Sequence, residues 1–339
     1  MLGGIFIMPS EAAVYFIDYQ NGDDNNSGVS QITSWQHAPG MPGFSAAYSH
    51  QAGDKFVFRG GVTWPAAALP LAIQFSGEEN TVDEYTVDFT WHAGSAWTQP
   101  VLDMEQTAKQ GVVVGSQDNL VVDNIKIINP ADQNFPSENM LVIGKGAQNI
   151  IVRNCTLDAA GGAGDAGPIV LRDVDGVVLD NNYIRGIKDD GNPDGILITP
   201  WTRMKNITIK NNVISMINHG DGIHIDVHND DDSSTPRFMD NYGPILIENN
   251  SFYDVQMGRK MAIILIGGAK DLTIRYNKFY GDFTESGIGV RFGGEAGTRR
   301  ANTLSEITQY IISGYICRII AKTRDGGQAS LTRKIGVIK

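Results

Sequence analysis

The segment VLDNNYI (residues 178–184) returns thirty residues later as TIKNNVI (residues 208–214). Each copy places an asparagine inside a run of β-branched and other apolar residues, and VVDNIKI, IVRNCTL, IENNSFY and IRYNKFY do the same. The steps between the recurring asparagines are 30, 28, 30, 38 and 27 residues; these asparagines are Asn124, Asn154, Asn182, Asn212, Asn250 and Asn277. A repeat of this length is the sequence signature of a stacked architecture.

A second series has the same period. The segments GPIVL, DGILI and DGIHI place Ile169, Ile196 and Ile223 at steps of 27 residues. Each period holds two or three short alternating strands broken by Gly, Asn or Asp, and one such unit buries its apolar face only by stacking on copies. An antiparallel sandwich would instead predict hairpin turns and no fixed period. The pattern therefore predicts a parallel β-helix, with the recurring asparagines stacked as an inward ladder at ~4.8 Å spacing.

The N-terminal segments YFIDYQNGDDNNSG, SWQHAPGMPG and GDKFVFRGGVTW precede this repeat. Together with the repeat they resemble the right-handed parallel β-helix superfamily, which includes pectate-lyase-like proteins, over roughly residues 14–320. The resemblance implies an N-terminal segment that caps the open core. It is specific for fold and less so for activity, because the scaffold hosts lyases, hydrolases, isomerases, phage tailspikes and adhesins.

The expected fold is thus all-β, a single-stranded right-handed parallel β-helix (solenoid) with an N-terminal cap segment. We assign residues 1–60 to the cap and first strands and residues 61–315 to the rungs. Residues 316–339 are assigned to a C-terminal cap or basic tail.

Charge and composition narrow the choice of partners. The chain has 27 Lys and Arg against 38 Asp and Glu, a net charge of −11, which argues against nucleic acid or an anionic membrane as partner. Cys155 and Cys317 are the only cysteines, so we expect two unpaired thiols rather than a disulfide framework. The start has a short apolar run and a small-residue site but no basic region, which makes it a weak match to a signal peptide. We expect an extracellular or secreted protein, a class that includes phage-borne proteins. The oligomeric state is not predicted.

One strand is unlike its neighbours. The segment HGDGIHIDVHNDDD (residues 219–232) holds three of the six histidines and five aspartates. Alternation turns Ile223 and its apolar partners inward and His224, Asp226 and His228 outward. The 27-residue step places Thr199 and Trp201 beside them and Arg172 one rung earlier, and a segment about ten residues longer than its neighbours follows the strand. This combination predicts a binding groove rather than a plain solvated surface.

A cation site is expected at a nearby corner. Asp194 and Asp221 each precede a Gly-Ile-x-Ile sequence, so stacking brings their carboxylates together. Carboxylates that close either share a proton or bind a cation, for which Ca²⁺ is the natural choice, with Asp190 as a third ligand. Stacked Asp-Gly turns with a purely structural role are the alternative.

These residues predict a carbohydrate-active enzyme that cleaves a polysaccharide, most simply a calcium-assisted uronate lyase. The predicted catalytic and substrate-binding residues are His224, Asp226, His228, Lys188, Arg259 and Lys260, with Trp201, Arg172, Thr199 and Arg291 against the sugar. The resemblance implies a Lys or Arg base, from which a histidine base departs. A glycoside hydrolase with paired aspartates and a non-catalytic tailspike or adhesin module are the two alternatives.

Overall fold

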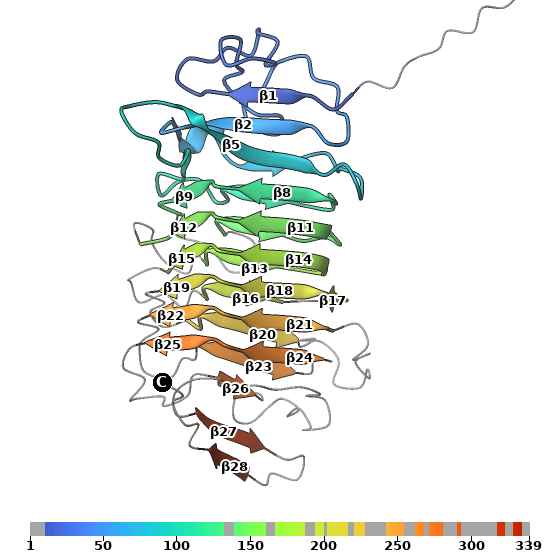
Figure 1. The fold of residues 1–339 in the computed structure, drawn as a ribbon, viewed down its shortest axis with the longest axis vertical. Helices are drawn as coiled ribbons and strands as arrows, with labels where there is room; N and C mark the ends of the chain where they lie inside the picture. The colour runs from blue at the N-terminus through green and yellow to red at the C-terminus, as the bar shows by residue number, and fades with distance from the viewer. Residues whose placement is uncertain are drawn as a thin grey trace, which may run out of the picture.

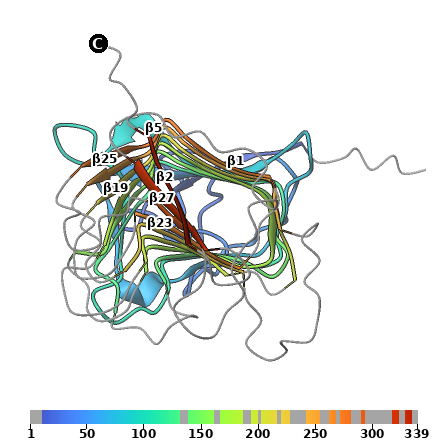
Figure 2. The ribbon, with the colours of Figure 1, turned by 90° about the horizontal axis from the view of Figure 1, so that it is seen from below.

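The computed structural model describes residues 11–131, 139–160, 167–186, 194–199, 202–215, 220–227, 242–253, 262–267, 271–280, 290–292, 317–322 and 328–333. Within them the chain winds as a parallel β-helix whose coils stack along one axis (Figure 1). Viewed along that axis, three sheets surround a common interior (Figure 2). No helix in this part of the chain is long and apolar enough to cross a membrane.

Each full coil contributes to the three sheets in the order A, B, C, with one strand per sheet except for one coil that has two short strands in sheet A. Sheet A contains β1 (Val14–Ile17), β2 (Lys55–Gly60), β5 (Asp83–His92), β8 (Leu120–Asp123), β11 (Gln148–Arg153), β14 (Val174–Asp180), β17 (Met204–Lys205), β18 (Ile207–Lys210), β21 (Ile245–Glu248) and β24 (Leu272–Arg275). Sheet B contains β3 (Thr63–Trp64), β6 (Val101–Asp103), β9 (Lys126–Ile128), β12 (Thr156–Asp158), β15 (Tyr183–Arg185), β19 (Val213–Ser215), β22 (Ser251–Tyr253) and β25 (Lys278–Tyr280).

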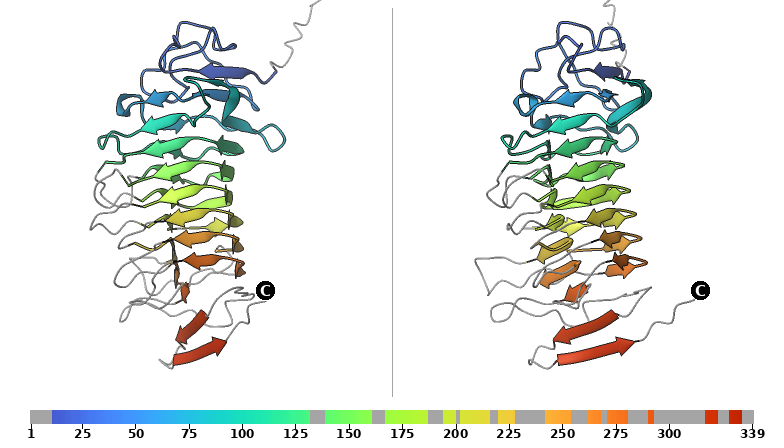
Figure 3. Two further views of the ribbon diagram at one scale, coloured as in Figure 1. Left: turned by 60° about the vertical axis from the view of Figure 1, so that its left-hand side comes forward. Right: turned by 90° about the vertical axis from the view of Figure 1, so that its left-hand side faces the viewer.

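Sheet C carries the remaining strand of each coil. Its members are β4 (Leu71–Ile73), β7 (Val112–Val114), β10 (Leu141–Ile143), β13 (Ile169–Leu171), β16 (Ile196–Ile198), β20 (Ile223–Val227), β23 (Ile263–Gly267) and β26 (Val290–Phe292). Beyond them, β27 (Cys317–Lys322) and β28 (Gln328–Arg333) form an antiparallel pair, and a 3₁₀ turn spans Ala66–Ala68. Figure 3 shows the same stacking from two further sides.

Register confirms the predicted period in sheet C. Ile169 pairs with Ile196 and Ile196 with Ile223, each a step of 27 residues, and all three are fully buried. Like residues therefore stack on like in the interior, because every second residue of a strand points to the same face.

The N-terminal segment lies across the first coil. β1 pairs in parallel with β2, and Ile17 and Trp35 are buried in the same core as the coils. The Trp35 ring lies against Gly28, where an added Cβ would meet the indole at 2.5 Å, so the turn requires glycine there. Asp18 accepts a hydrogen bond from Arg59 of β2 at 2.6 Å, which ties the segment to the sheet.

The asparagine ladder forms at the turn between sheets A and B, but over fewer coils than predicted. Asn182, Asn212, Asn250 and Asn277 are buried, and the Nδ2 of each of the first three donates to Oδ1 of the next at 3.0 Å. The same Oδ1 atoms accept the backbone N–H of the preceding asparagine at 2.9 Å. Each amide thus satisfies backbone groups that the turn would leave buried and unpaired.

The assignment of Asn124 and Asn154 to this ladder was wrong. Both adopt left-handed backbone conformations, with φ of 61° and 54°, one residue before the inward position. Asn181, Asn211 and Asn249 hold the same position in later coils, with φ between 55° and 57°. Asparagine is chosen there because it tolerates this conformation, whereas the inward position of the two early coils is Ile125 and Cys155.

Cys155 continues the ladder in a weaker form. Its backbone N–H donates to Oδ1 of Asn182 at 2.9 Å, and its Sγ lies 3.7 Å from the carbonyl oxygen of Val122. That carbonyl corresponds to the Val152 oxygen that accepts from Nδ2 of Asn182. Burial raises the pKa of the Cys155 thiol to about 12, so this free thiol is an unreactive packing group.

Replacing Asn212 with alanine is expected to destabilise the protein by about 3 kcal/mol, because it leaves the N–H and Nδ2 of Asn182 without their shared acceptor in a buried turn. Chemical denaturation monitored by circular dichroism measures the change. Thr208→Ala, on the outer face of sheet A, is the control. An Asn212→Ala midpoint no lower than that of the control would contradict a stabilising ladder.

Replacing Cys155 with asparagine is expected to hold or raise the thermal midpoint, because the amide can donate to Val122 as Asn182 donates to Val152. Cys155→Leu, of similar apolar character but without a donor, is expected to lower it. Thermal melts of both variants make the comparison, and equal losses would show that the position only fills space.

Opposite charges alternate along the outer face of sheet A. The register stacks Asp123, Arg153, Asp180, Lys210, Glu248 and Arg275 in one column. Asp123 and Arg153 lie 2.8 Å apart, Asp180 and Lys210 3.3 Å, and Glu248 and Arg275 2.6 Å. Because the basic partners are well exposed, each pair contributes ~1 kcal/mol or less.

Candidate functional site

Two aspartates meet at the corner where the chain enters sheet C. Asp194 stands two residues before β16 and Asp221 two residues before β20, and the register of these strands places the aspartates in successive coils. The backbone N–H of Asp221 donates to Oδ1 of Asp194 at 2.7 Å. The structure brings the pair together, as the 27-residue step predicts.

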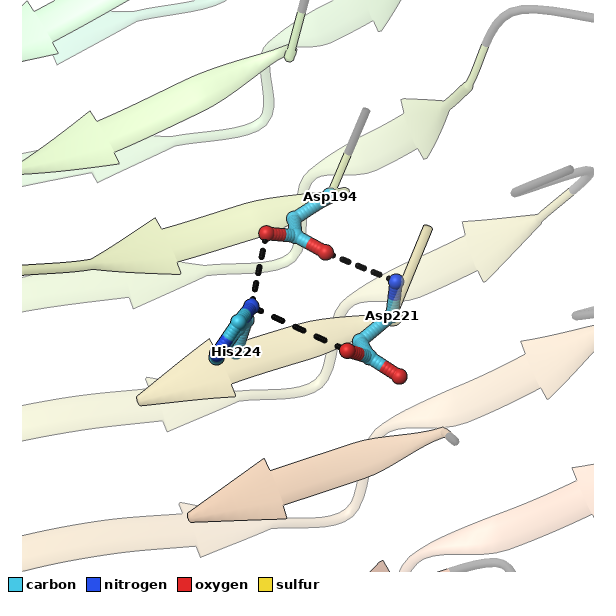
Figure 4. A group of neighbouring side chains, drawn as sticks. All are labelled: Asp194, Asp221 and His224. Carbon is cyan, nitrogen blue, oxygen red and sulfur yellow. Dashed lines mark hydrogen bonds and ion pairs between the residues drawn. The ribbon is translucent and has the colours of Figure 1, made fainter. Parts of the chain in front are cut away.

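His224 completes a cluster with this pair. On β20 the flanking Ile223 and Ile225 are fully buried, so His224 occupies the outer face of sheet C. Its Nδ1 lies 2.9 Å from Oδ2 of Asp194 and 3.7 Å from Oδ2 of Asp221 (Figure 4). Both carboxylates therefore face one nitrogen of the imidazole ring.

Burial differs among the three side chains. Those of Asp194 and Asp221 are 10% and 4% exposed, and that of His224 is 19% exposed. The adjoining outward positions of sheet C, Leu197 and Val170, are buried and apolar. Charges in such a partly water-excluded setting interact more strongly than at an open surface.

The same corner of an earlier coil shows which contact of Asp194 serves the backbone and which does not. Asn139, two residues before β10, accepts the backbone N–H of Gly167 on its Oδ1 at 3.1 Å. Two coils further on, Oδ1 of Asp194 does the same for the backbone N–H of Asp221 in the coil that follows it. An asparagine therefore serves the backbone at this corner, and what aspartate adds is a charged Oδ2 directed at His224.

A family model described as the right-handed beta helix region matches residues 72–252, more than half of the chain. The chain belongs to the right-handed β-helix family. This confirms the expected fold class and its handedness. No curated protein sequence matches the chain.

Several solved structures are similar to this chain. They include a native lacto-N-biosidase of family GH136 from Eubacterium ramulus, at 12% identity and a TM-score of 0.42, with 88% of this chain and 67% of that chain covered. A rhamnogalacturonan lyase is 14% identical, with a TM-score of 0.45 and coverage of 89% and 90%. The pectate lyase Pel9A is 13% identical, with a TM-score of 0.45 and coverage of 86% and 74%. At these identities and TM-scores no activity is carried over from these structures to this chain.

Arg172 and Thr199 occupy a second outward column of the β-helix. Thr199 follows β16, and its N–H donates to the carbonyl oxygen of Leu171 at 3.0 Å. This hydrogen bond keeps Thr199 in register with Arg172 beyond the ends of their strands. Burial lowers the pKa of the half-buried Arg172 because desolvation disfavours its charged form, and neighbouring Asp173 opposes the shift.

The other predicted residues are placed only in part. Asp226 lies in β20, in register with Ile266 of β23, and Arg291 lies in β26, two coils beyond His224 in the same register column. The rest lie outside the described residues; they are His228, Lys188, Arg259, Lys260, Trp201 and Asp190. So does most of the long segment after His228, residues 229–241.

That the histidine and the aspartate pair form one cluster was not predicted from the sequence. There His224 belonged to the groove, and Asp194 and Asp221 to a separate metal site. The signal was present, because His224 follows Asp221 by three residues in a strand that is one 27-residue step from Asp194. Within the described residues, these three side chains form the group whose potential metal-ligand atoms all lie within 4.8 Å of one another.

Proposed function

We propose that the protein is a carbohydrate-active enzyme that cleaves a uronate-containing polysaccharide as a lyase, with His224 as its general base. The observation that carries the proposal is the contact of 2.9 Å between Nδ1 of His224 and Oδ2 of Asp194. A base held at Nδ1 by a carboxylate presents Nε2 as its reactive nitrogen, and the carboxylate stabilises the imidazolium once it forms.

Burial of the carboxylates favours this chemistry over hydrolysis. A glycoside hydrolase sets two carboxyl groups on either side of the scissile bond. Both oxygens of Asp194 are engaged, one by the Asp221 N–H and one by His224, and Asp221 is only 4% exposed. The imidazole is the most exposed side chain of the cluster, at 19%.

The proposed step is a β-elimination. Nε2 of His224 takes the C5 proton, the electron pair of that C–H bond forms the C4–C5 double bond, and the C4–O bond breaks. The departing oxygen takes the electron pair of the C4–O bond, and the imidazolium returns its proton there. Arg172, on the same face of sheet C, is proposed to pair with a substrate carboxylate and Thr199 to donate to a sugar oxygen.

Calcium remains a prediction that the described residues fit only in part. Asp194 and Asp221 supply two carboxylates, fewer than the six to eight oxygens that Ca²⁺ takes, and a nitrogen stands between them. Asp190, the third predicted ligand, lies outside the described residues. A bound cation would neutralise the substrate carboxylate and so acidify the C5 proton.

Product chemistry tests the proposal. Purified protein is incubated with pectate, alginate and glycosaminoglycans, with Ca²⁺ and with chelator, and the ultraviolet absorbance of an unsaturated product is followed beside reducing ends. Absorbance and reducing ends that rise together support a lyase. Reducing ends without absorbance would show that the protein is a hydrolase. Neither signal, together with retention on a polysaccharide column, would show that it is a binding module. An extracellular location is part of the proposal, since such polymers lie outside cells, and fractionation of a producing culture checks it.

A further inference from the structure

We propose that Asp194, Asp221 and His224 form a binding site for a divalent transition metal of the zinc class. We further propose that the bound ion inhibits the enzyme through His224; this second half rests on the proposed function.

The geometry of the cluster is close to that of such a site. Zinc binds His nitrogen and carboxylate oxygen at about 2.0–2.2 Å, so ligand atoms around a tetrahedral ion lie roughly 3.3 Å apart. Nδ1 of His224 lies 2.9 Å and 3.7 Å from the nearest oxygens of Asp194 and Asp221. Movements of under about 1 Å convert this arrangement into three ligands with a fourth position open.

The chemistry of the donors selects the class of ion. Two carboxylates and one imidazole nitrogen suit zinc and its neighbours, whereas Ca²⁺ and Mg²⁺ prefer oxygen alone. The two carboxylates are largely buried side by side, and a cation between them relieves their repulsion. The Asp221 N–H donates to Oδ1 of Asp194 and so orients this carboxylate, as hydrogen bonds to metal ligands commonly do.

Metal binding and base catalysis compete for the same ring. A neutral imidazole carries one proton; when Nδ1 binds a metal, that proton resides on Nε2. Nε2 then lacks the lone pair that would accept the C5 proton. Occupation of the site therefore removes the base without displacing any side chain from the cluster.

Calorimetric titration of the untagged full chain with Zn²⁺, and separately with Ca²⁺, tests the site. We expect about one Zn²⁺ per chain and Ca²⁺ at least about 100-fold weaker. Asp221→Asn and His224→Gln are each expected to weaken Zn²⁺ binding by about 10- to 100-fold or more. Asp180→Asn, which removes a carboxylate from the outer face of sheet A, is the charge-matched control and keeps wild-type binding. Circular dichroism melts establish that all variants fold.

The possible outcomes separate this inference from the proposed function. Absence of Zn²⁺ binding, or binding that survives both site substitutions, overturns the site even if the protein is an active lyase. Zinc binding lost in both variants supports the site even if no lyase activity is found, in which case the proposed function fails by itself. In an active lyase, activity unchanged by saturating Zn²⁺ would overturn the inhibitory half.

Discussion

His224→Ala is expected to lower kcat on the polysaccharide substrate by a factor of about 10² to 10⁴, the usual contribution of a positioned general base. The side chain lies on the outer face of sheet C, and the inward positions beside it, Ile223 and Ile225, stay filled. The thermal midpoint is therefore expected to change little. Initial rates from product absorbance, with parallel melting curves, measure both effects.

A second histidine supplies the control for this experiment. His92 ends β5 in sheet A, away from the sheet C cluster, so His92→Ala is expected to retain wild-type turnover. A His224→Ala enzyme with turnover within about twofold of this control would remove the histidine from the mechanism. A folded His224→Ala protein with normal KM and depressed kcat is the result that a base requires.

Asp194→Asn is expected to reduce kcat by as much as about 10³ to 10⁴ while preserving stability. The amide keeps an oxygen for the Asp221 N–H, as Asn139 does for Gly167 in an earlier coil. It loses the charge that holds and stabilises the imidazolium, and loss of that partner favours the wrong tautomer. Steady-state kinetics and thermal melts of the same preparation separate the two roles.

Asp194→Ala is the informative companion, because it removes the backbone acceptor as well. We expect it to be inactive and also less stable than Asp194→Asn by about 1–3 kcal/mol. If the asparagine variant unfolds as readily as the alanine variant, the carboxylate is a structural group of the corner. Full activity of Asp194→Asn would show that His224 works without its partner.

The sequence repeat was enough to predict most of the fold. The misassignment of two asparagines to the ladder has a physical cause. In the pairs Asn181–Asn182 and Asn211–Asn212 the two asparagines have different roles. The first adopts the left-handed conformation of the turn, and the second directs its amide into the ladder. In earlier coils only the turn asparagine is present, so Asn154 was aligned with the wrong member of the pair. The step of 28 residues from Asn154 to Asn182, against 27 for the isoleucines of sheet C, marks that slip.

The candidate site was harder to predict than the fold, because the spacing of residues in the sequence does not give the distances between their side chains. Stacking two Asp-Gly turns required only the period, and Asp194 and Asp221 were found that way. The contact of 2.9 Å between Nδ1 of His224 and Oδ2 of Asp194 depends on the rotamer of the imidazole, which turns toward the preceding coil. Periodicity fixes the face of a side chain but not its rotamer.

The alternating charges on sheet A respond differently to the loss of one coil and of two. Loss or duplication of a single coil would join neighbours of equal sign, for example Arg153 to Lys210 if the coil of Asp180 were removed. Two adjacent coils can be added or deleted together with every attraction intact. A change of two coils therefore preserves the alternation of charge, whereas a change of one interior coil exchanges an attraction for a repulsion of about 1 kcal/mol or less.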